Sequence, residues 1–428
     1  MLRVTIIFDS EFTWRSYSES GVIQELSNEH KIRIIFINMT PNIEIKNINI
    51  EHIKTGKLIR FFLTINSFSY WATNRKYSQS FQIRVKSIVK GRRLFFEINK
   101  GSSNRSISSV IGILLGILKL RLPISLYFMS AFNLNKHLNY KSQDCYIYPT
   151  TGGPLTLADY LTHYCGRVGK KLIICIDNWD NIFSKAVFHL KPKNILVWGP
   201  QAAYFAQKAH KIPKRNIIEA GAPRVEYTLN NLKNISQEKD LKILFAGGSF
   251  DFRTEMFWLE NMVNSISSKT TLLYLPHPIN YKFAIPNHEK IRTLGIKMIK
   301  PDIFSDIKHN KQLPSLNLYH KLFQEIRVVV SPLSTMSLEA LVYGKISIGI
   351  DFAEKLTLNK QSKTWWASES YEHYFGLIDH PNFILVKNHK ELNEIDFESL
   401  VAAKSTKTNY FYNPKGFISS LSHGLTND

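Results

Sequence analysis

Hydroxyl side chains follow an apolar run in the second half of the sequence, at the point where a helical pattern begins. The run Val328–Ser331 leads through Pro-Leu to Ser334 and Thr335, and the helical pattern closes at Gly344. Hydroxyls at a helix start cap the free backbone N–H groups, and the same groups hold a phosphate when one binds. Glu339 lies on the same helix face as Thr335, where it either accepts a hydrogen bond from a ribose or faces solvent.

Two other apolar runs of this half end in groups with matching chemistry. After Thr271–Leu275 comes Pro-His-Pro, in which the prolines stop the strand and the histidine can donate to a phosphate oxygen. After Lys242–Ala246 comes Gly-Gly-Ser, which allows close backbone approach. Each of these ends, taken alone, is equally typical of an ordinary turn. Together they favour one anion site made of Gly247, Gly248, Ser249, Arg253, His277, Pro278, Ser334, Thr335 and Glu339.

Carboxylates follow apolar runs in the first half of the sequence. One run ends before Asp9, with Glu19 in the helical stretch behind it, and another ends in Asp-Asn-Trp-Asp-Asn. A carboxylate there could deprotonate a substrate hydroxyl, or it could cap a turn or helix. The tryptophan is a candidate for stacking on a sugar face. The candidate bases are Asp9, Glu19, Asp177 and Asp180, and the candidate acceptor-binding residues are Asn178 and Trp179.

Short apolar runs alternate with helical patterns along most of the chain, which predicts parallel sheets with helical crossovers. A polar stretch, Thr228–Asp240, divides the runs into two series. We therefore predict an α/β fold of two Rossmann-like, doubly wound domains facing a cleft. They span residues 1–228 and 241–428, with a linker at 229–240 and with the last residues able to pack back on the N-terminal domain. The predicted strands are Arg3–Phe8, Ile32–Ile37, Cys145–Tyr148, Lys171–Ile176, Asn194–Val197, Ile217–Glu219, Lys242–Ala246, Thr271–Leu275, Ile296–Ile299, Val328–Ser331 and Ile346–Ile350.

The order of these motifs resembles a known group of enzymes. A strand followed by His-Pro, then Ser-Thr at a helix start, a Glu and a Gly-Lys turn, resembles the C-terminal domain of GT-B glycosyltransferases. The resemblance is to those with cytidine-linked donors: bacterial sialyltransferases, capsule Kdo transferases and CDP-glycerol glycerophosphotransferases. The segment NIIEAGAPRVEY, Asn216–Tyr227, is similar to the Gly-x-Pro-Arg segment of the last group. The resemblance implies that His277, Ser334 and Thr335 contact the donor phosphate.

The expected activity is therefore transfer of a sugar from a nucleotide-activated donor, with cytidine-linked donors favoured. The expected acceptor is a surface polysaccharide or a lipid-linked glycan, and neither a metal nor a cofactor is expected. The alternatives are a CDP-polyol phosphotransferase of the teichoic-acid type and a nucleotide-sugar 2-epimerase. A nucleic-acid-binding protein is disfavoured, because the sequence carries no recognisable RNA- or DNA-binding module.

Charge and cysteine content point to an anionic partner and a reducing compartment. The 428 residues include 55 Lys and Arg against 34 Asp and Glu, a net charge of +21, and three cysteines without paired spacing. The basic residues Arg84, Lys86, Lys90, Arg92 and Arg93 precede an apolar stretch, Ser109–Phe132, whose charges and proline make it too short to span a bilayer. We expect a cytoplasmic protein docked on the anionic inner face of the cytoplasmic membrane, unless the basic stretch is simply solvated.

Overall fold

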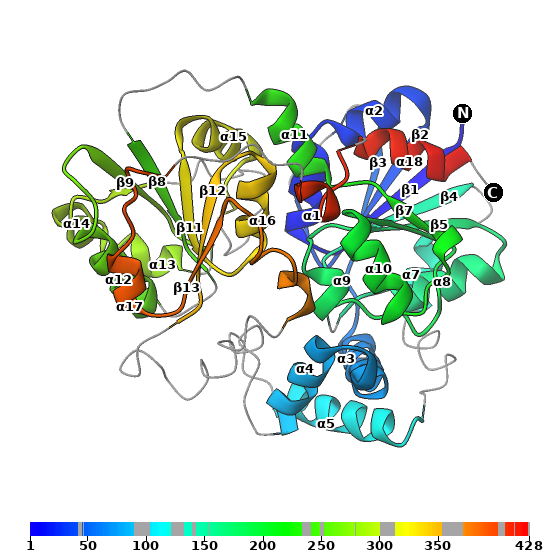
Figure 1. The fold of residues 1–428 in the computed structure, drawn as a ribbon. Coiled ribbons are helices and arrows are strands. Elements are labelled where there is room, and N and C mark those ends of the chain that lie inside the picture. Colours follow the sequence, from blue (N-terminus) through cyan, green and yellow to red (C-terminus); the bar gives the residue numbers. More distant parts are fainter. Residues whose placement is uncertain are drawn as a thin grey trace. The chain divides into compact units, whose positions relative to one another are not determined.

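The computed structural model describes residues 1–41, 45, 47–89, 103–120, 132–138, 143–153, 155–232, 241–248, 252–278, 280–299, 313–352, 371–400, 407–414 and 416–426. The chain divides into two compact units. The first consists mainly of Met1–Glu226 and Asn409–Asp428, and the second of Tyr227–Phe304 and His309–Thr408. Each unit contains one parallel sheet with helices packed on it (Figure 1).

Within the described residues, the first sheet has seven parallel strands in the order β3-β2-β1-β4-β5-β6-β7. The central strands are buried along almost their whole length, as expected of strands covered on both faces. The edge strand β3 was not predicted, because its sequence NIEHI mixes polar and apolar residues and most of it is not buried. The strands are β1 (Arg3–Phe8), β2 (Lys31–Ile37), β3 (Asn49–Ile53), β4 (Cys145–Thr150), β5 (Lys171–Ile176), β6 (Asn194–Val197) and β7 (Ile217–Glu219).

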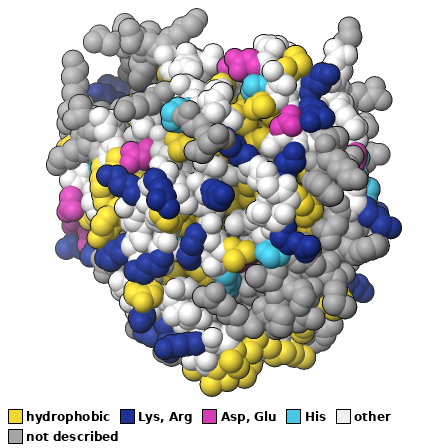
Figure 2. Space-filling view, turned by 90° about the vertical axis from the view of Figure 1, so that its right-hand side faces the viewer, with side chains coloured by type: hydrophobic (Ala, Val, Ile, Leu, Met, Phe, Trp, Pro, Cys, Tyr) yellow, Lys and Arg dark blue, Asp and Glu magenta, His cyan; other side chains and the backbone are white. Residues whose placement is uncertain are grey.

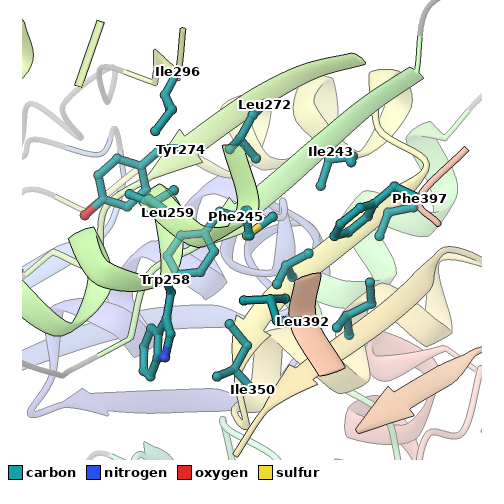
Figure 3. Close-up of a cluster of buried hydrophobic side chains, with 14 of the residues drawn as sticks. Ile243, Phe245, Trp258, Leu259, Leu272, Tyr274, Ile296, Ile350, Leu392 and Phe397 are labelled. Atoms are coloured by element: carbon teal, nitrogen blue, oxygen red, sulfur yellow. The ribbon is translucent and has the colours of Figure 1, made fainter. Parts of the chain in front are cut away.

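The second sheet has six described strands in the order β10-β9-β8-β11-β12-β13. One face of it carries a core of aliphatic and aromatic side chains that includes Phe245, Trp258 and Tyr274 (Figure 3). The short strand β13 was not predicted. The strands are β8 (Leu241–Ala246), β9 (Thr270–Leu275), β10 (Lys297–Met298), β11 (Val328–Pro332), β12 (Ile346–Ile350) and β13 (Phe383–Val386).

Helices connect the strands of both sheets. Those of the first unit are α1 (Glu11–Glu19), α2 (Val22–Glu29), α3 (Lys57–Asn74), α4 (Gln79–Val89), α5 (Ser103–Ile117), α7 (Phe132–Leu138), α8 (Ala158–Arg167), α9 (Asn181–Ser184), α10 (Pro200–Lys208), α11 (Pro223–Asn231), which continues into the second unit, and α18 (Phe417–Thr426). Those of the second unit are α12 (Phe252–Val263), α13 (Tyr281–Ala284), α14 (His288–Thr293), α15 (Leu316–Glu325), α16 (Thr335–Val342) and α17 (His389–Asn393). The fold is thus α/β with two Rossmann-like sheets, as predicted.

The two sheets share a strand order that reverses at one point. In the first sheet β1 lies between β2 and β4, and in the second β8 lies between β9 and β11. Ligands of open parallel sheets bind at such a switch point, beyond the carboxyl ends of the strands. The residues that follow β1 and β4, and those that follow β8, β9 and β11, are therefore the places to look for chemistry.

A helical insertion between β3 and β4 packs α5 closely on α3 (Figure 1). Side chains at Gly112 and Gly116 would come within 2.5 Å of Ile65 O and 2.4 Å of Ser69 O, so only glycine permits this approach. Arg84, expected on a membrane-facing basic stretch, is instead buried with its guanidinium 4.8 Å from the centre of the Trp71 ring. Lys86 is exposed, whereas Lys90, Arg92 and Arg93 lie outside the described residues. No helix in the described ranges is long and apolar enough to cross a membrane.

Candidate functional site

Gly247 occupies the end of β8, beside the end of β9. Its N–H donates to Leu275 O at 2.9 Å, which continues the β8–β9 pairing beyond the strands. A Cβ atom on Gly247 would lie 2.8 Å from the backbone N of His277 and 2.8 Å from both carboxylate oxygens of Glu255. No side chain fits there. The backbone of Gly247 and the buried Gly248 is consequently bare where the sheet ends, as close approach to a ligand requires.

His277 and Pro278 are half-buried in the turn that follows β9. Asn280 N–H closes this turn by donating to His277 O at 2.7 Å. The side chain of Asn280 reaches back to Gly248 O at 3.4 Å, so the turn after β9 and the loop after β8 are joined directly. The structure therefore brings the Gly-Gly and His-Pro motifs together, as the sequence pattern predicted.

Glu255 supports both loops from behind, and the sequence reasoning missed it. It is completely buried in the first turn of α12, where it accepts hydrogen bonds from Tyr274 Oη at 2.5 Å and from Asn280 Nδ2 at 2.8 Å. Burial and the neighbouring carboxylate of Glu255 raise the pKa of the Tyr274 hydroxyl far above its usual range, so this hydroxyl remains a donor. Glu255 stands in a helical pattern like any other glutamate, and only its contacts across three elements reveal this role.

Ser334 begins α16 at the end of β11, the other neighbour of β8. It is the N-cap residue and forms a capping box with Ser337, whose Oγ accepts from Ser334 N–H at 3.4 Å. The predicted cap is thus confirmed, and Gly344 closes the helix with φ of +71°. Ser334 and Thr335 are half-buried. Glu339 is buried, which overturns the alternative that it is a solvated helix residue.

The remaining donor-site candidates fall in different places. Arg253 is exposed on the first turn of α12. Ser249 lies outside the described residues. Three strand ends, those of β8, β9 and β11, therefore supply the described part of this site.

Asp9 and Tyr148 meet at the switch point of the first sheet. Asp9 follows β1, and Tyr148 lies on the neighbouring β4, from which its hydroxyl donates to the Asp9 carboxylate. The same hydroxyl accepts from Leu157 N–H at 3.0 Å. Burial raises the pKa of the Asp9 carboxyl to about 6, although the hydrogen bond from Tyr148 acts to lower it. A carboxylate with this pKa titrates close to neutral pH, as suits a general base.

A glycine-rich turn follows β4 at the same edge of the sheet. Gly152 and Gly153 have φ of +65° and +96°, and Gly152 N–H donates to Thr150 Oγ1 at 2.9 Å. These conformations favour glycine. The sequence reasoning passed over both Tyr148 and this turn, although the letters TTGGP after an apolar run were a visible signal.

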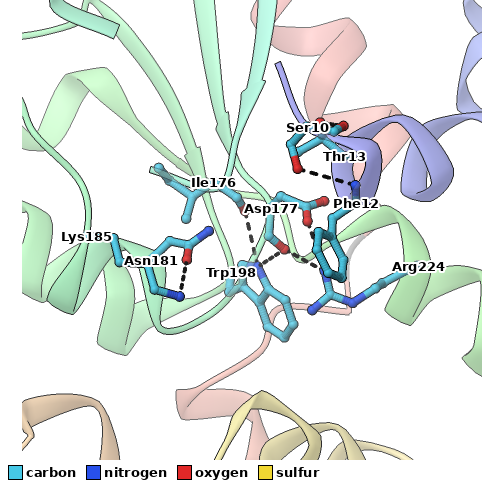
Figure 4. A network of polar contacts seen from close by, with 9 residues as sticks. All are labelled: Ser10, Phe12, Thr13, Ile176, Asp177, Asn181, Lys185, Trp198 and Arg224. Atoms are coloured by element: carbon cyan, nitrogen blue, oxygen red, sulfur yellow. Dashed lines mark hydrogen bonds and ion pairs between the residues drawn. The ribbon is translucent and has the colours of Figure 1, made fainter. Parts of the chain in front are cut away.

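Asp177 is buried at the end of β5 and paired with Arg224 of the Gly-x-Pro-Arg segment (Figure 4). Arg224 Nη1 lies 3.2 Å from Asp177 Oδ2 and 2.9 Å from Asp177 O. The guanidinium also lies 5.2 Å from the centre of the Trp198 ring, whose Nε1 donates to Asp177 O at 3.1 Å. A buried carboxylate that is ion-paired with a guanidinium is poorly placed to take a proton from a substrate, whereas Asp9 has a hydroxyl partner and a raised pKa. This geometry favours Asp9 over Asp177 as the candidate base.

The other first-unit candidates are placed as follows. Asp180 is the N-cap residue of α9, and its Oδ2 lies 2.7 Å from Lys185 Nζ. Glu19 is half-buried at the end of α1, and Asn178 is half-buried after β5. Trp179 corrects our expectation: its ring is completely buried and its Nε1 donates to Gln201 Oε1 at 2.8 Å, which leaves no ring face for a sugar. In the described part of the chain, no three His, Cys, Asp or Glu side chains gather as a metal site would need.

Comparison with solved structures identifies the fold of the chain. No protein-family model matches the sequence. No curated protein matches it either. The crystal structure of Acinetobacter baumannii MurG aligns with a TM-score of 0.52 and 11% identity, over 99% of this chain and 100% of that one. The fold is GT-B.

Weaker alignments reach two other solved structures. The UDP-GlcNAc 2-epimerase of Methanocaldococcus jannaschii, in complex with UDP-GlcNAc and UDP, gives a TM-score of 0.49 and 14% identity, over 99% of each chain. The wall teichoic acid polymerase TagF gives 0.47 and 10%, over 99% of this chain and 86% of that one. At such identities the likeness to MurG shows the fold alone, and the two weaker alignments add nothing to it.

Proposed function

We propose that the chain is a glycosyltransferase that takes a sugar from a nucleotide-activated donor. The observation that carries this proposal is the convergence at the switch point of the second sheet. There the Gly247–Gly248 backbone, the His277 turn and the start of α16 stand at the ends of three adjacent strands. Backbone N–H groups, hydroxyls and an imidazole are the groups that hold a phosphate.

In this proposal the second unit binds the donor through its phosphates. His277 donates a hydrogen bond to the leaving phosphate, and the N-terminus of α16 with Ser334 and Thr335 faces its negative charge. Glu255 keeps the loop after β8 and the turn after β9 in place through Tyr274 and Asn280. When the bond between the sugar and the phosphate breaks, the electron pair leaves with the nucleotide, and these donors stabilise the charge that develops.

The first unit binds the acceptor in this proposal, and Asp9 is the base. Asp9 takes the proton from an acceptor hydroxyl while the oxygen of that hydroxyl forms the bond to the sugar. Tyr148 holds the carboxylate in position and donates to it. We further propose a cytidine-linked donor, an acceptor that is a surface polysaccharide or lipid-linked glycan, and a reaction without metal or cofactor, on the resemblance of the sequence motifs.

Nucleotide binding tests the proposal directly. A nucleotide that binds the folded state alone raises its stability, by about 2.7 kcal/mol at a concentration a hundred times Kd. Thermal unfolding would be followed with CMP, CDP, UDP, GDP and dTDP, and we expect the cytidine nucleotides to give the largest shift. Stabilisation by none of the five would contradict a nucleotide-dependent enzyme. A larger shift with UDP, GDP or dTDP would replace cytosine as the predicted nucleobase of the donor.

A matched pair of glycine variants locates the site. Gly247→Ala should abolish the nucleotide-dependent shift, because its Cβ would lie 2.8 Å from Glu255 and from His277 N. Gly166→Ala in α8 adds the same methyl group with nothing within 4 Å, and should keep the shift. If the Gly247→Ala variant kept the nucleotide-dependent shift of its unfolding temperature, the nucleotide would not bind at the end of β8.

A further inference from the structure

The helical insertion of the first unit carries an exposed apolar stripe along α5. Ile107, Val110, Leu114 and Ile117 follow one another at spacings of three, four and three residues, which places them on one helix face. Each is between 48% and 55% exposed. Soluble helices normally turn such a face inward, so a continuous exposed stripe marks an interaction surface.

The opposite face of α5 fixes the stripe in this orientation. Ser108, Ser109, Gly112, Ile113 and Gly116 are buried. Gly112 and Gly116 press against the backbone of α3 so closely that no side chain would fit at either position. Rotating α5 to bury the stripe would remove the small residues from this contact. The exposure of the stripe is therefore built into the packing of α3 and α5.

The charge of the region indicates what covers the stripe. Between His52 and Gln143 the sequence holds sixteen Lys and Arg residues and a single acidic one, Glu97. Most of the net charge of +21 thus lies in this insertion and its flanks. In Figure 2 apolar side chains gather along the lower edge, and Lys and Arg side chains lie on the surface above them. A second copy of the chain would bring like charges together, which disfavours self-association.

A group of lysines lies next to the end of the stripe. The ammonium groups of Lys76 and Lys211 are 4.8 Å and 4.2 Å from the centre of the exposed Tyr77 ring. Thr73 Oγ1 donates to Gly116 O at 3.2 Å, which holds the end of α5, and Lys119 after it, beside the end of α3. A hydrogen bond from Lys76, with the charges of Lys76, Lys211 and Lys119, lowers the pKa of the Tyr77 hydroxyl. Lys119 follows α5 by two residues. Tyrosine beside lysine, next to an apolar face, is typical of a membrane–water interface.

We propose that the stripe Ile107–Val110–Leu114–Ile117 inserts into the surface of an anionic lipid bilayer, with Lys76, Lys119 and Lys211 binding its headgroups. The helix lies in the plane of the interface and does not cross the membrane. This surface belongs to the first unit alone and is independent of donor chemistry. Vesicle binding and nucleotide binding can therefore fail separately.

Co-sedimentation with vesicles tests the charge of the partner. The probes are phosphatidylcholine vesicles with and without phosphatidylglycerol, at several salt concentrations. Binding should require the anionic lipid and weaken as salt rises. Lys76→Asn, Lys119→Asn and Lys211→Asn together should weaken it roughly a hundredfold, because each cation near an anionic leaflet contributes about fivefold. Asn is chosen because Lys119 and Lys211 have φ of 56° and 58°, which Asn tolerates.

A control with the same change of charge is available in the second unit. Lys290→Asn, Lys297→Asn and Lys390→Asn alter three exposed lysines far along the chain, and binding should stay within about twofold of wild type. If this control lost as much affinity as the first triple variant, only net charge would matter and the assigned lysine group would be wrong.

The stripe is tested by a matched pair of double variants. Val110→Gln with Leu114→Gln should reduce vesicle binding at least tenfold while thermal unfolding stays the same, because both side chains are exposed. Phe283→Gln with Ile285→Gln, which removes two equally exposed apolar residues of the second unit, should bind as wild type. If the wild type and both double variants bound the vesicles equally, the proposal would be wrong.

Insertion itself can be seen with a single fluorescent label. The three native cysteines are buried, and burial raises the thiol pKa of Cys145 and Cys175 to about 12, so a new exposed cysteine is labelled selectively. An environment-sensitive dye on Leu114→Cys should shift to the blue with anionic vesicles, and the same dye on Phe283→Cys should not. A blue shift at position 114 that depends on protein concentration without vesicles would mean self-association and would reject the membrane assignment.

Discussion

At the scale of single residues, the proposed phosphate-binding role of His277 rests on its place after β9, in a turn joined to the Gly247–Gly248 loop. His277→Ala should lower kcat about 10²–10³-fold, the loss typical of one donor to a developing negative charge. The fold should survive because the side chain is half-buried in a turn. His288→Ala, a histidine of α14 in the same unit, is the control. Wild-type turnover of His277→Ala at saturating donor would remove it from the mechanism.

Asp9 should impose an acidic limb on the pH profile. Its carboxyl has a pKa of about 6 and must be ionised to accept a proton, so kcat/KM should rise with pH through about 6 and then level off. Tyr148 donates to the carboxylate and lowers this pKa, so Tyr148→Phe should move the limb to higher pH. Asp9→Asn should lose about 10²–10⁴ in kcat/KM and the limb with it. If the acidic limb of the Tyr148→Phe variant lies at the same pH as in the wild type, the limb reports the titration of a group other than Asp9.

The same carboxyl should lower the free energy of unfolding as it ionises, between about pH 4 and 6. Because the pKa of Asp9 is about 6 when folded and near 3.8 when unfolded, the folded state binds the proton more tightly. The free energy of unfolding therefore falls as pH rises from about 4 to 6 and is constant above that. Asp9→Asn should gain up to about 3 kcal/mol at pH 8 and little at pH 4. Denaturant unfolding at the two pH values measures this, and an equal effect at both would contradict it.

At the scale of elements, Asp177 and Arg224 connect the end of β5 to the start of α11. Breaking a buried pair by removing one partner typically costs 3–5 kcal/mol, so Asp177→Ala should destabilise the first unit by about that much. Asp180→Ala, whose pair with Lys185 is more exposed, should cost about 1 kcal/mol or less. Comparable stability of the two variants would show that the Arg224 pair is not structural.

Most strands could be predicted from sequence because burial on both faces demands continuous apolar runs, as in β1 and β5. That signal fades at the sheet edges, where β3 carries Asn49, Glu51 and His52, and for a strand as short as β13. The donor-site candidates were found because parallel strands end at the same edge of their sheet. Glu255 and Tyr148 were missed, since each acts through a hydrogen bond to a distant residue that no local pattern records.

At the scale of the whole molecule, residues from the C-terminal part of the chain complete the first unit. A Cβ atom on Gly424 of α18 would lie 3.3 Å from Ile173 Cδ1 and 3.5 Å from Ile218 Cδ1, so α18 packs on the sheet. Asn413 N–H donates to Trp198 O at 2.8 Å. Removing residues 409–428 should therefore expose the sheet and lower the unfolding temperature of the first unit by several degrees or more, while the second unit unfolds as before. Two-transition calorimetry checks this, and a loss confined to the second unit would contradict it.

This return of the chain also sets an order of events during synthesis on a ribosome. The first unit is interrupted at Glu226, and its remaining segment is translated only after the second unit. A nascent chain thus carries all seven described strands of the first sheet, with the surface that α18 covers still exposed, for the time needed to translate roughly 180 residues, on the order of ten seconds or more. The second unit extends to Thr408, so the last segment of the first unit is translated directly after it. Until then, chaperones should meet the first unit with the α18-binding surface of its sheet exposed.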